Sequence, residues 1–426
     1  MTVGPIVTFL YRQRWTTSHI MFLGIFLQCT GLLAASWAVY SLVGLFLTQG
    51  IPFGLGVGFL YTSSMGTISQ WFNKKRSVAN GIAAAGSGIG GLCFTIGINR
   101  AIENLGVGWS FRLTAIVVAV VNTVAALLIR DRNAQIKPTQ RSFDYGLLKR
   151  IPNLGLVLLW GFFSLMGYVA ILFSMADYAH SIGLSASQGS IASAMLSVGM
   201  VFGRPCVGLM SDIYGRINIS ALMTLLSAVT VFGLWMPAGD TGFWLCLVFA
   251  LFNGAVCGTF WATISPITAE IVGLKELPSA LSIVWFSTIP PSIFGEAIVL
   301  ALKRPELGGV DARFKGAAYI YPQVWAGLMY LIATAAIWVL RARMIAAKIK
   351  SEAEQENGME NGEGDMEGSK EEGRESSESG GYTRDELEKH EVYEERGEGH
   401  RRQIIPIPTV ISRWRKAGRW WRWTQV

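Results

Sequence analysis

The chain has 426 residues, of which 51% are hydrophobic and only 15% are charged, with a mean hydropathy of +0.39. Soluble globular domains carry about 25% charged residues, so this composition excludes a water-soluble globular protein and indicates a membrane protein. The net charge of +7 is typical of lysine and arginine in the cytosolic loops of such proteins and does not predict nucleic-acid binding.

The apolar runs predict an all-α polytopic membrane protein, because a helix needs about 20 apolar residues to cross a bilayer. The segment Met1–Leu10 is apolar but too short to cross. Ten complete crossings are expected after it, at residues 18–38, 42–70, 78–98, 111–130, 152–176, 188–210, 218–236, 242–264, 279–301 and 318–340.

Basic residues determine the expected orientation, because lysine and arginine gather in cytosolic loops. They collect at Asn73–Arg76, Asp131–Arg150 and Arg341–Lys350, and these loops alternate with poorly charged ones such as Pro237–Thr241. Both termini are therefore expected on the cytosolic side. The loop Lys303–Lys315 does not fit the rule, since it is charged yet falls on the outer side.

One motif in the second half of the chain has the spacing G-x-x-x-D-x-x-G-R, formed by Gly208, Asp212, Gly215 and Arg216. Gly208 would let two helices approach closely, and Asp212 can accept hydrogen bonds from a helix N-terminus or an arginine. Gly215 suits a tight turn, and Arg216 suits an anchor at the headgroups. The spacing resembles the signature gating loop of the major facilitator superfamily of secondary transporters. An ordinary glycine–aspartate turn is the alternative.

This resemblance implies the major facilitator fold, with two pseudo-symmetric helix bundles. The polar segment 131–151 would be a cytosolic loop that joins an N-terminal bundle at 1–130 to a C-terminal six-helix bundle at 152–342. Each bundle is expected to be one of two repeats related by an axis along the membrane normal.

Similar stretches recur at an offset of about 200 residues. Pro5–Arg14 is similar to Pro205–Tyr214, and Ser77–Ile82 is similar to Pro278–Ile283. On this offset almost nothing precedes the turn of the first half, whereas two helices precede the turn of the second half. The first bundle is therefore expected to be incomplete, lacking helix 1 and most of helix 2 of the family.

A second motif follows the second expected crossing. Trp71–Gly81, followed by Ala85–Gly90, resembles the entry into helix 5 in the monocarboxylate-transporter branch of the superfamily, in its fungal form. The motif would place cations at the cytosolic headgroups and small residues against a neighbouring helix. The residues that carry this interpretation are Lys74, Lys75, Arg76, Gly81 and Gly86.

Arg204 is the strongest candidate for substrate binding, because an arginine inside a span is costly and normally faces a cavity or a partner. The same branch carries an Arg-Pro pair associated with the substrate carboxylate, which a guanidinium can bind through two hydrogen bonds. The alternatives are that Arg204 reaches the cytosolic surface or pairs with a loop carboxylate such as Asp212. Met200 is a departure from the branch, which has a carboxylate associated with proton coupling at that position.

Glu296 and Asn253 are the other substrate-binding candidates within the spans. Glu296 could bind a proton or lie at the outer headgroups, and Asn253 could bind a solute or bridge two helices. Four aromatic residues could stack on a planar ligand or could serve bundle packing alone. They are Trp160, Tyr168, Trp261 and Trp285.

Neither an enzyme nor a bound metal or cofactor is expected. The sequence has no phosphate-binding loop, catalytic triad or metal-ligand spacing, and its five cysteines lie within apolar runs. The leading interpretation is a secondary active transporter of a small organic solute, such as a monocarboxylate-like anion. Its transport could be coupled to that of a proton. The alternative is a transporter-like sensor or an inactive truncated paralogue.

Residues 343–426 are expected to form a cytosolic tail that is largely disordered. Ser351–His400 is acidic and almost free of apolar residues, so it cannot bury a core. Arg401–Val426 instead interleaves tryptophan with arginine, which suits contact with anionic lipid at the inner membrane surface. A misread end of the gene or a degron-like segment are the alternatives.

Overall fold

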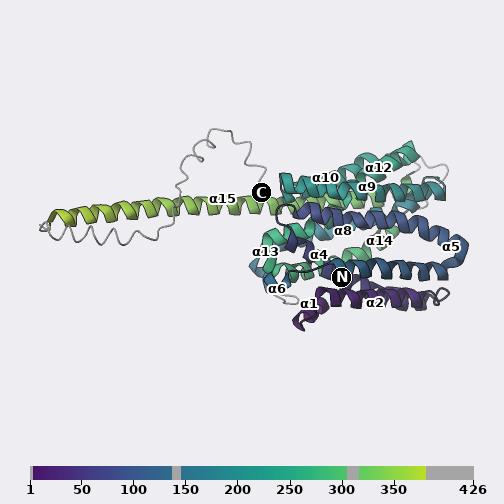
Figure 1. Ribbon diagram of the computed structural model, residues 1–426. Helices are drawn as coiled ribbons and strands as arrows, with labels where there is room; N and C mark the ends of the chain where they lie inside the picture. Colours follow the sequence, from purple (N-terminus) through teal and green to yellow (C-terminus); the bar gives the residue numbers. More distant parts are fainter. Residues whose placement is uncertain (1–2, 137–144, 305–315, 380–426) are drawn as a thin grey trace. The chain divides into compact units, whose positions relative to one another are not determined.

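The computed structural model describes residues 3–136, 145–304 and 316–379. Contacts divide the chain into two units, residues 1–342 and 343–425. Within the described ranges the regular elements are all helices, which confirms the predicted all-α class (Figure 1).

The helices of the first unit follow the apolar runs of the sequence. The first half contains α1 (Gly4–Arg12), α2 (Thr17–Ala35), α3 (Leu42–Leu45), a π-helical segment (Phe46–Phe53), α4 (Gly54–Trp71) and α5 (Arg76–Leu128). The short helices α6 (Asn133–Ile136) and α7 (Tyr145–Arg150) follow. The second half contains α8 (Pro152–Ser181), α9 (Ala186–Tyr214), α10 (Arg216–Thr230), α11 (Ala238–Thr241), α12 (Phe243–Cys257), α13 (Thr259–Ser287), α14 (Ile289–Leu302) and α15 (Ile320–Ser379).

Nine helical segments in the described part of the chain are long and apolar enough to cross a membrane. One of them, Phe243–Leu302, has 60 residues. At about 1.5 Å per residue it is far longer than the ~30 Å hydrocarbon core. Gly273 interrupts it with a positive φ of 75°, and the two arms cover the crossings expected at 242–264 and 279–301. The nine segments thus accommodate the ten predicted crossings.

Helix α9 lies between α5 and α12, and glycines let the three backbones approach closely. A Cβ atom on Gly203 would lie 2.2 Å from Cα of Ala255 in α12, and one on Gly208 would lie 2.4 Å from the carbonyl oxygen of Ser77 in α5. Because lipid tails are as apolar as leucine, helices in membranes associate through such small-residue contacts. The glycine rows therefore fix α9, which carries Arg204, between its neighbours.

Two of the close contacts follow the offset of about 200 residues that the sequence suggests. A Cβ atom on Gly81 would lie 2.4 Å from the carbonyl oxygen of Arg204, and one on Gly4 would lie 3.5 Å from Cα of Ser282. Adding the offset of about 200 residues to Gly4 and Gly81 gives Arg204 and Ser282. Helices α5 and α9 therefore meet as α13 and α1 do, in agreement with two related halves.

Gly81→Ala is expected to lower the stability of the first unit by about 1–3 kcal/mol, since a backbone oxygen cannot move aside as a side-chain end can. Gly86→Ala is the matched control, because nothing lies within 4 Å of a Cβ at that position of the same helix. Thermal unfolding of the full chain in detergent measures both. Equal unfolding temperatures for the two variants would show that α5 and α9 are not held this closely.

The second unit begins within α15, which continues as a helix to Ser379. The composition predicts disorder from Ser351 onward, so the helix extends further than expected. Glutamate, lysine and methionine are good helix formers, no proline interrupts residues 324–379, and Lys350 forms an i,i+4 ion pair with Glu354 at 3.7 Å. The segment 401–426, for which we predict lipid contact, lies outside the described residues.

Candidate functional site

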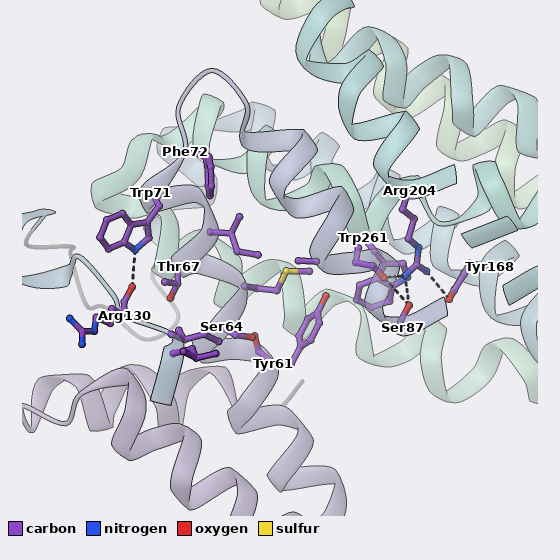
Figure 2. A pocket seen from close by; sticks show the side chains of 16 residues that line it. Tyr61, Ser64, Thr67, Trp71, Phe72, Ser87, Arg130, Tyr168, Arg204 and Trp261 are labelled. Carbon is purple, nitrogen blue, oxygen red and sulfur yellow. Dashed lines mark hydrogen bonds between the residues drawn. The ribbon is translucent and has the colours of Figure 1, made fainter. Parts of the chain in front are cut away.

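A cavity of about 830 Å³ opens inside the first unit, within the range typical of small-molecule sites. Its wall comes from α4, both ends of α5, and single residues of α8, α9 and α13 (Figure 2). The lining residues are Tyr61, Ser64, Met65, Thr67, Ile68, Trp71, Phe72, Ala83, Ala84, Ser87, Leu128, Ile129, Arg130, Tyr168, Arg204 and Trp261.

Arg204 projects from α9 into this wall and is only 2% exposed. Its Nη1 donates to the carbonyl oxygen of Ala84 at 2.6 Å and to the hydroxyl of Ser87, both in α5. Its Nη2 donates to the hydroxyl of Tyr168 in α8 at 3.3 Å (Figure 2). The same nitrogen lies 3.6 Å from Sδ of Met200. The guanidinium therefore does not reach the cytosolic surface or Asp212; it joins three helices around the cavity.

The charge of Arg204 is surrounded by neutral acceptors. Its Nε is buried without a hydrogen-bond partner, and among the described residues no carboxylate lies within 4.0 Å of its guanidinium. Gly258 makes room for the group, because a Cβ there would lie 2.6 Å from Nε. A buried cation that lacks a counter-ion favours an anionic ligand, which can form charge-assisted hydrogen bonds with it.

An aromatic cluster lies beside Arg204. Trp261 lines the cavity and stacks on Trp285 with ring centroids 6.1 Å apart and an interplanar angle of 12°. Tyr61 and Tyr168 contact Trp261 edge-on at 5.8 and 6.3 Å. Trp160 instead donates to Thr224 at 3.1 Å and is not part of the cavity wall. Of the four aromatic candidates, Tyr168 and Trp261 are therefore the two that reach the cavity.

Asn253 and Glu296 do not line this cavity. Asn253 is fully buried in α12 and donates to the hydroxyl of Thr230 at 2.9 Å, so it bridges two helices. Glu296 is half-buried in α14 and accepts a hydrogen bond from Ser174 in α8 at 3.5 Å. The structure therefore brings neither residue together with Arg204.

Asp212 caps the N-terminus of α5. Its two carboxylate oxygens accept from the backbone N–H groups of Ser77 at 3.1 Å and Val78 at 2.9 Å. The partial positive charge of a helix N-terminus favours such a carboxylate. Gly215 has a positive φ of 97°, which turns the chain directly into α10.

Arg216 extends this contact to two further segments. Its Nε lies 3.5 Å from Asp212, its Nη1 lies 3.3 Å from a carboxylate oxygen of Glu270 in α13, and its Nη2 donates to the carbonyl oxygen of Asn73 at 2.9 Å. We call Asp212, Arg216, Glu270 and the first turn of α5 the latch. Arg216 thus bridges protein groups in addition to lying next to a turn.

The helix-5 entry residues divide into two groups. Lys74 and Lys75 are exposed, whereas Arg76 is buried and its Nε donates to the carbonyl oxygen of Phe72 at 2.9 Å. Gly81 contacts α9 closely, but Gly86 faces open space, so the interpretation of Gly86 as a packing residue is wrong. Gly88, two turns after Gly81 on the same face of α5, takes that role: a Cβ there would lie 2.8 Å from a backbone oxygen of α9.

The structure explains in part why the loop that begins at Lys303 carries charge although it is expected on the outer side. Nζ of Lys303 lies 2.5 Å from a carboxylate oxygen of Asp177 in α8, and the hydroxyl of Tyr319 also donates to Asp177. This cation is therefore neutralised within the protein. The rest of the loop, at 305–315, lies outside the described residues.

Several cavity residues could not be recognised in the sequence. Tyr61, Ala84 and Ser87 sit in long apolar or small-residue runs, where nothing distinguishes them from residues that face lipid. Gly258 resembles any membrane glycine. The one available signal is that Arg204 is expensive to bury, which implies that acceptors for its N–H groups must exist on adjacent helices.

Comparisons with known proteins agree with this architecture. The family model described as Major Facilitator Superfamily matches residues 3–286 and 157–355. The probable transporter MCH2 of Saccharomyces cerevisiae is 33% identical over 347 residues, which cover 80% of this chain and 71% of that protein. The uncharacterized transporter ESBP6 of the same yeast is 26% identical over 83% of this chain, which spans about half (53%) of its length.

The fold also resembles solved transporter structures. The E. coli fucose:proton symporter FucP superimposes with a TM-score of 0.60 at 14% sequence identity, covering 78% of this chain and 87% of that one. This likeness concerns the fold alone. The family match and the candidate membrane spans identify an integral, multi-pass membrane transporter. The chain belongs to the Major Facilitator Superfamily.

Proposed function

We propose that the protein is a secondary active transporter that carries a small organic anion by alternating access between its two helix bundles. The observation that carries this proposal is the Arg204 guanidinium. It is buried in the wall of a cavity of about 830 Å³, and its described hydrogen-bond acceptors are all neutral. A carboxylate entering the cavity would supply the missing negative charge.

A monocarboxylate-like anion is the form of substrate that the sequence motifs favour. The entry into α5 resembles the monocarboxylate-transporter branch, and Arg204 matches the arginine that this branch associates with its substrate. Met200, at the position of the branch's carboxylate, contacts Arg204 through its sulfur at 3.6 Å. Anion binding would therefore proceed without the competing carboxylate that the branch places there.

Alternating access requires contacts between the bundles that break and re-form. The latch joins α9 and α10 of the second bundle to the N-terminus of α5 in the first. In the proposed cycle, it holds the cytosolic side closed and opens when the cavity faces the cytosol. Each of its hydrogen bonds between the bundles has one charged member, Asp212 or Arg216, so each lost bond shifts the equilibrium between the two states.

A coupled proton is a further part of the proposal, supported by the name of the fucose:proton symporter, whose fold this chain shares. Glu296 is the carboxylate that we assign to it, although it lies outside the cavity wall and contacts Ser174. Glu296→Gln is expected to abolish stimulation of uptake by an inward proton gradient while binding to Arg204 persists. Unchanged stimulation in that variant would remove Glu296 from proton coupling.

Both termini are proposed to be cytosolic. A reporter fused after Lys350 is expected to be protected from outside reagents in intact cells, whereas one inserted at Pro237–Asp240 is expected to be accessible. The charge asymmetry of the loops is the physical reason. The opposite labelling pattern would overturn this orientation, and with it the side of the membrane on which the latch lies.

Uptake into proteoliposomes that contain the full chain tests the central proposal. We expect saturable uptake of labelled acetate, lactate or benzoate above that of protein-free liposomes, and no such protein-dependent uptake of benzamide, which has no charge. Saturable, protein-dependent uptake of benzamide would contradict an anion site. Binding of a carboxylate without any uptake would instead support the alternative of a sensor that does not transport.

A further inference from the structure

We infer that the Arg204 site takes an aromatic monoanion, with its charged head at Arg204 and Tyr61 and its ring against Trp261. The inference rests on the proposed anion site, and it specifies the uncharged part of the substrate as an aromatic ring. It assigns Tyr61 as a second donor for the head group, and it selects Trp261 from the four aromatic candidates as the stacking surface for the ring.

The head group has a second donor in Tyr61. Its hydroxyl oxygen is buried and has no hydrogen-bond partner, although Tyr61 lines the cavity. Figure 2 shows the hydroxyl end of Tyr61 as the end nearer to Arg204. A buried hydroxyl without a partner is costly. A carboxylate oxygen between Tyr61 and Arg204 would satisfy both this hydroxyl and the positive charge.

Trp261 provides a rigid surface for a ring. Trp285 covers one side of its indole and is itself fully buried, while Tyr61, Tyr168 and Phe260 hold its edges at centroid distances of 5.8, 6.3 and 5.4 Å. These contacts fix the orientation of the indole before a ligand arrives. A preorganised aromatic surface favours a planar aromatic partner over an aliphatic one of equal size.

The rest of the cavity suits an uncharged body. Arg204 and Arg130 are the charged residues in its described lining, and Figure 2 places Arg130 with Trp71 at the end away from Arg204. The remaining wall is mostly apolar or aromatic. A cavity of about 830 Å³ also leaves most of its volume unused by a two- or three-carbon acid, so a ring-bearing monoanion fits it better.

Binding of four small molecules to the purified full chain in nanodiscs tests the inference. Benzoate and cyclohexanecarboxylate have similar size and equal charge but differ in aromaticity, acetate lacks the body, and benzamide lacks the charge. We expect benzoate to bind most tightly.

Trp261→Leu is expected to lower the affinity for benzoate about two- to tenfold more than the affinity for cyclohexanecarboxylate. This factor corresponds to the free energy of aromatic pairing beyond that of buried area. Trp244→Leu is the matched control, because Trp244 is 77% exposed and lies outside the cavity.

Tyr61→Phe tests the second donor. It removes one hydroxyl and is expected to weaken every carboxylate about tenfold or more, since hydrogen bonds to charged groups are strong. Tyr330→Phe is the control: its hydroxyl is also buried without a partner, but the residue does not line the cavity. Equal effects of the two variants would remove Tyr61 from the site.

The outcomes separate this inference from the proposed function. If benzoate binds equally well to Arg204→Ala, the anion site itself is wrong. If binding requires Arg204 but cyclohexanecarboxylate matches benzoate and Trp261→Leu weakens both alike, the anion site stands and the aromatic preference is overturned. If acetate binds as tightly as benzoate, the assignment of a ring-bearing body is likewise overturned.

Discussion

Arg204→Lys is expected to bind an anionic solute as weakly as Arg204→Ala does, although lysine keeps the positive charge. A guanidinium presents a planar fork that binds both oxygens of a carboxylate, whereas an ammonium is a point donor on a flexible stem. The fork also spans from Ala84 and Ser87 in α5 to Tyr168 in α8, a span that one ammonium cannot match. Removing a hydrogen bond to a charged group costs about 1.5–3 kcal/mol, so affinity should fall roughly ten- to a hundredfold.

Uptake of labelled benzoate into proteoliposomes, measured over a range of concentrations, gives the apparent affinity of each variant. Membrane abundance and thermal stability of Arg204→Lys serve as controls for folding, since lysine fills most of the same space. Wild-type affinity in the lysine variant would show that only the charge matters. Arg204 would then be a general electrostatic attractor and not a geometric receptor for a carboxylate.

Asp212→Asn is expected to slow transport strongly while leaving solute affinity nearly unchanged. The carboxylate accepts from two N–H groups at the start of α5 and pairs with Arg216, and the asparagine side chain has one oxygen and no charge. One of the two hydrogen bonds is lost and the other no longer has a charged acceptor, which together cost about 1.5–3 kcal/mol. That loss shifts the balance between latched and open states roughly ten- to a hundredfold.

The measurement compares the maximal rate of uptake with the affinity from equilibrium binding. Asp240→Asn is the matched control, because Asp240 lies in the first turn of the short helix α11 and is exposed. A fall in rate for Asp212→Asn alone, with binding retained, is the expected result. Loss of the protein from the membrane together with loss of binding would show instead that the contact serves only folding.

The latch could be anticipated from the sequence because its chemistry is local. Asp212, Gly215 and Arg216 fall within five residues, and a carboxylate in the last turn of a membrane helix has few suitable partners other than a helix N-terminus or an arginine. The partner segment, Ser77 and Val78, could be found only in the structure. Which helix ends adjoin depends on the packing of whole bundles, and this is not encoded near either residue.

The cavity was less predictable, for a physical reason. In a membrane chain, residues that face lipid, neighbouring helices or a cavity are equally apolar, so Tyr61 carries no distinguishing pattern. Trp261 could be named only as one of four aromatic residues that could stack on a ligand or pack the bundle. The rotation of a helix about its axis decides which glycine meets a neighbour, and this is why Gly81 was anticipated correctly and Gly86 was not. Arg204 is distinguished in the sequence because a buried arginine needs polar partners, whereas Asn253 is an uncharged amide that donates to Thr230 within the bundle and leaves its Oδ1 without a partner.

The hydrogen bonds of Arg204 to α5 have a consequence for the speed of the carrier. A solute that binds the guanidinium through Nη1 must displace the carbonyl of Ala84 or the hydroxyl of Ser87, which already accept from that group. Those acceptors return when the solute leaves, so they lower the net binding energy and shorten the time for which the solute stays bound. A transporter gains from brief occupancy, because a solute held for long would delay every later turn of the cycle.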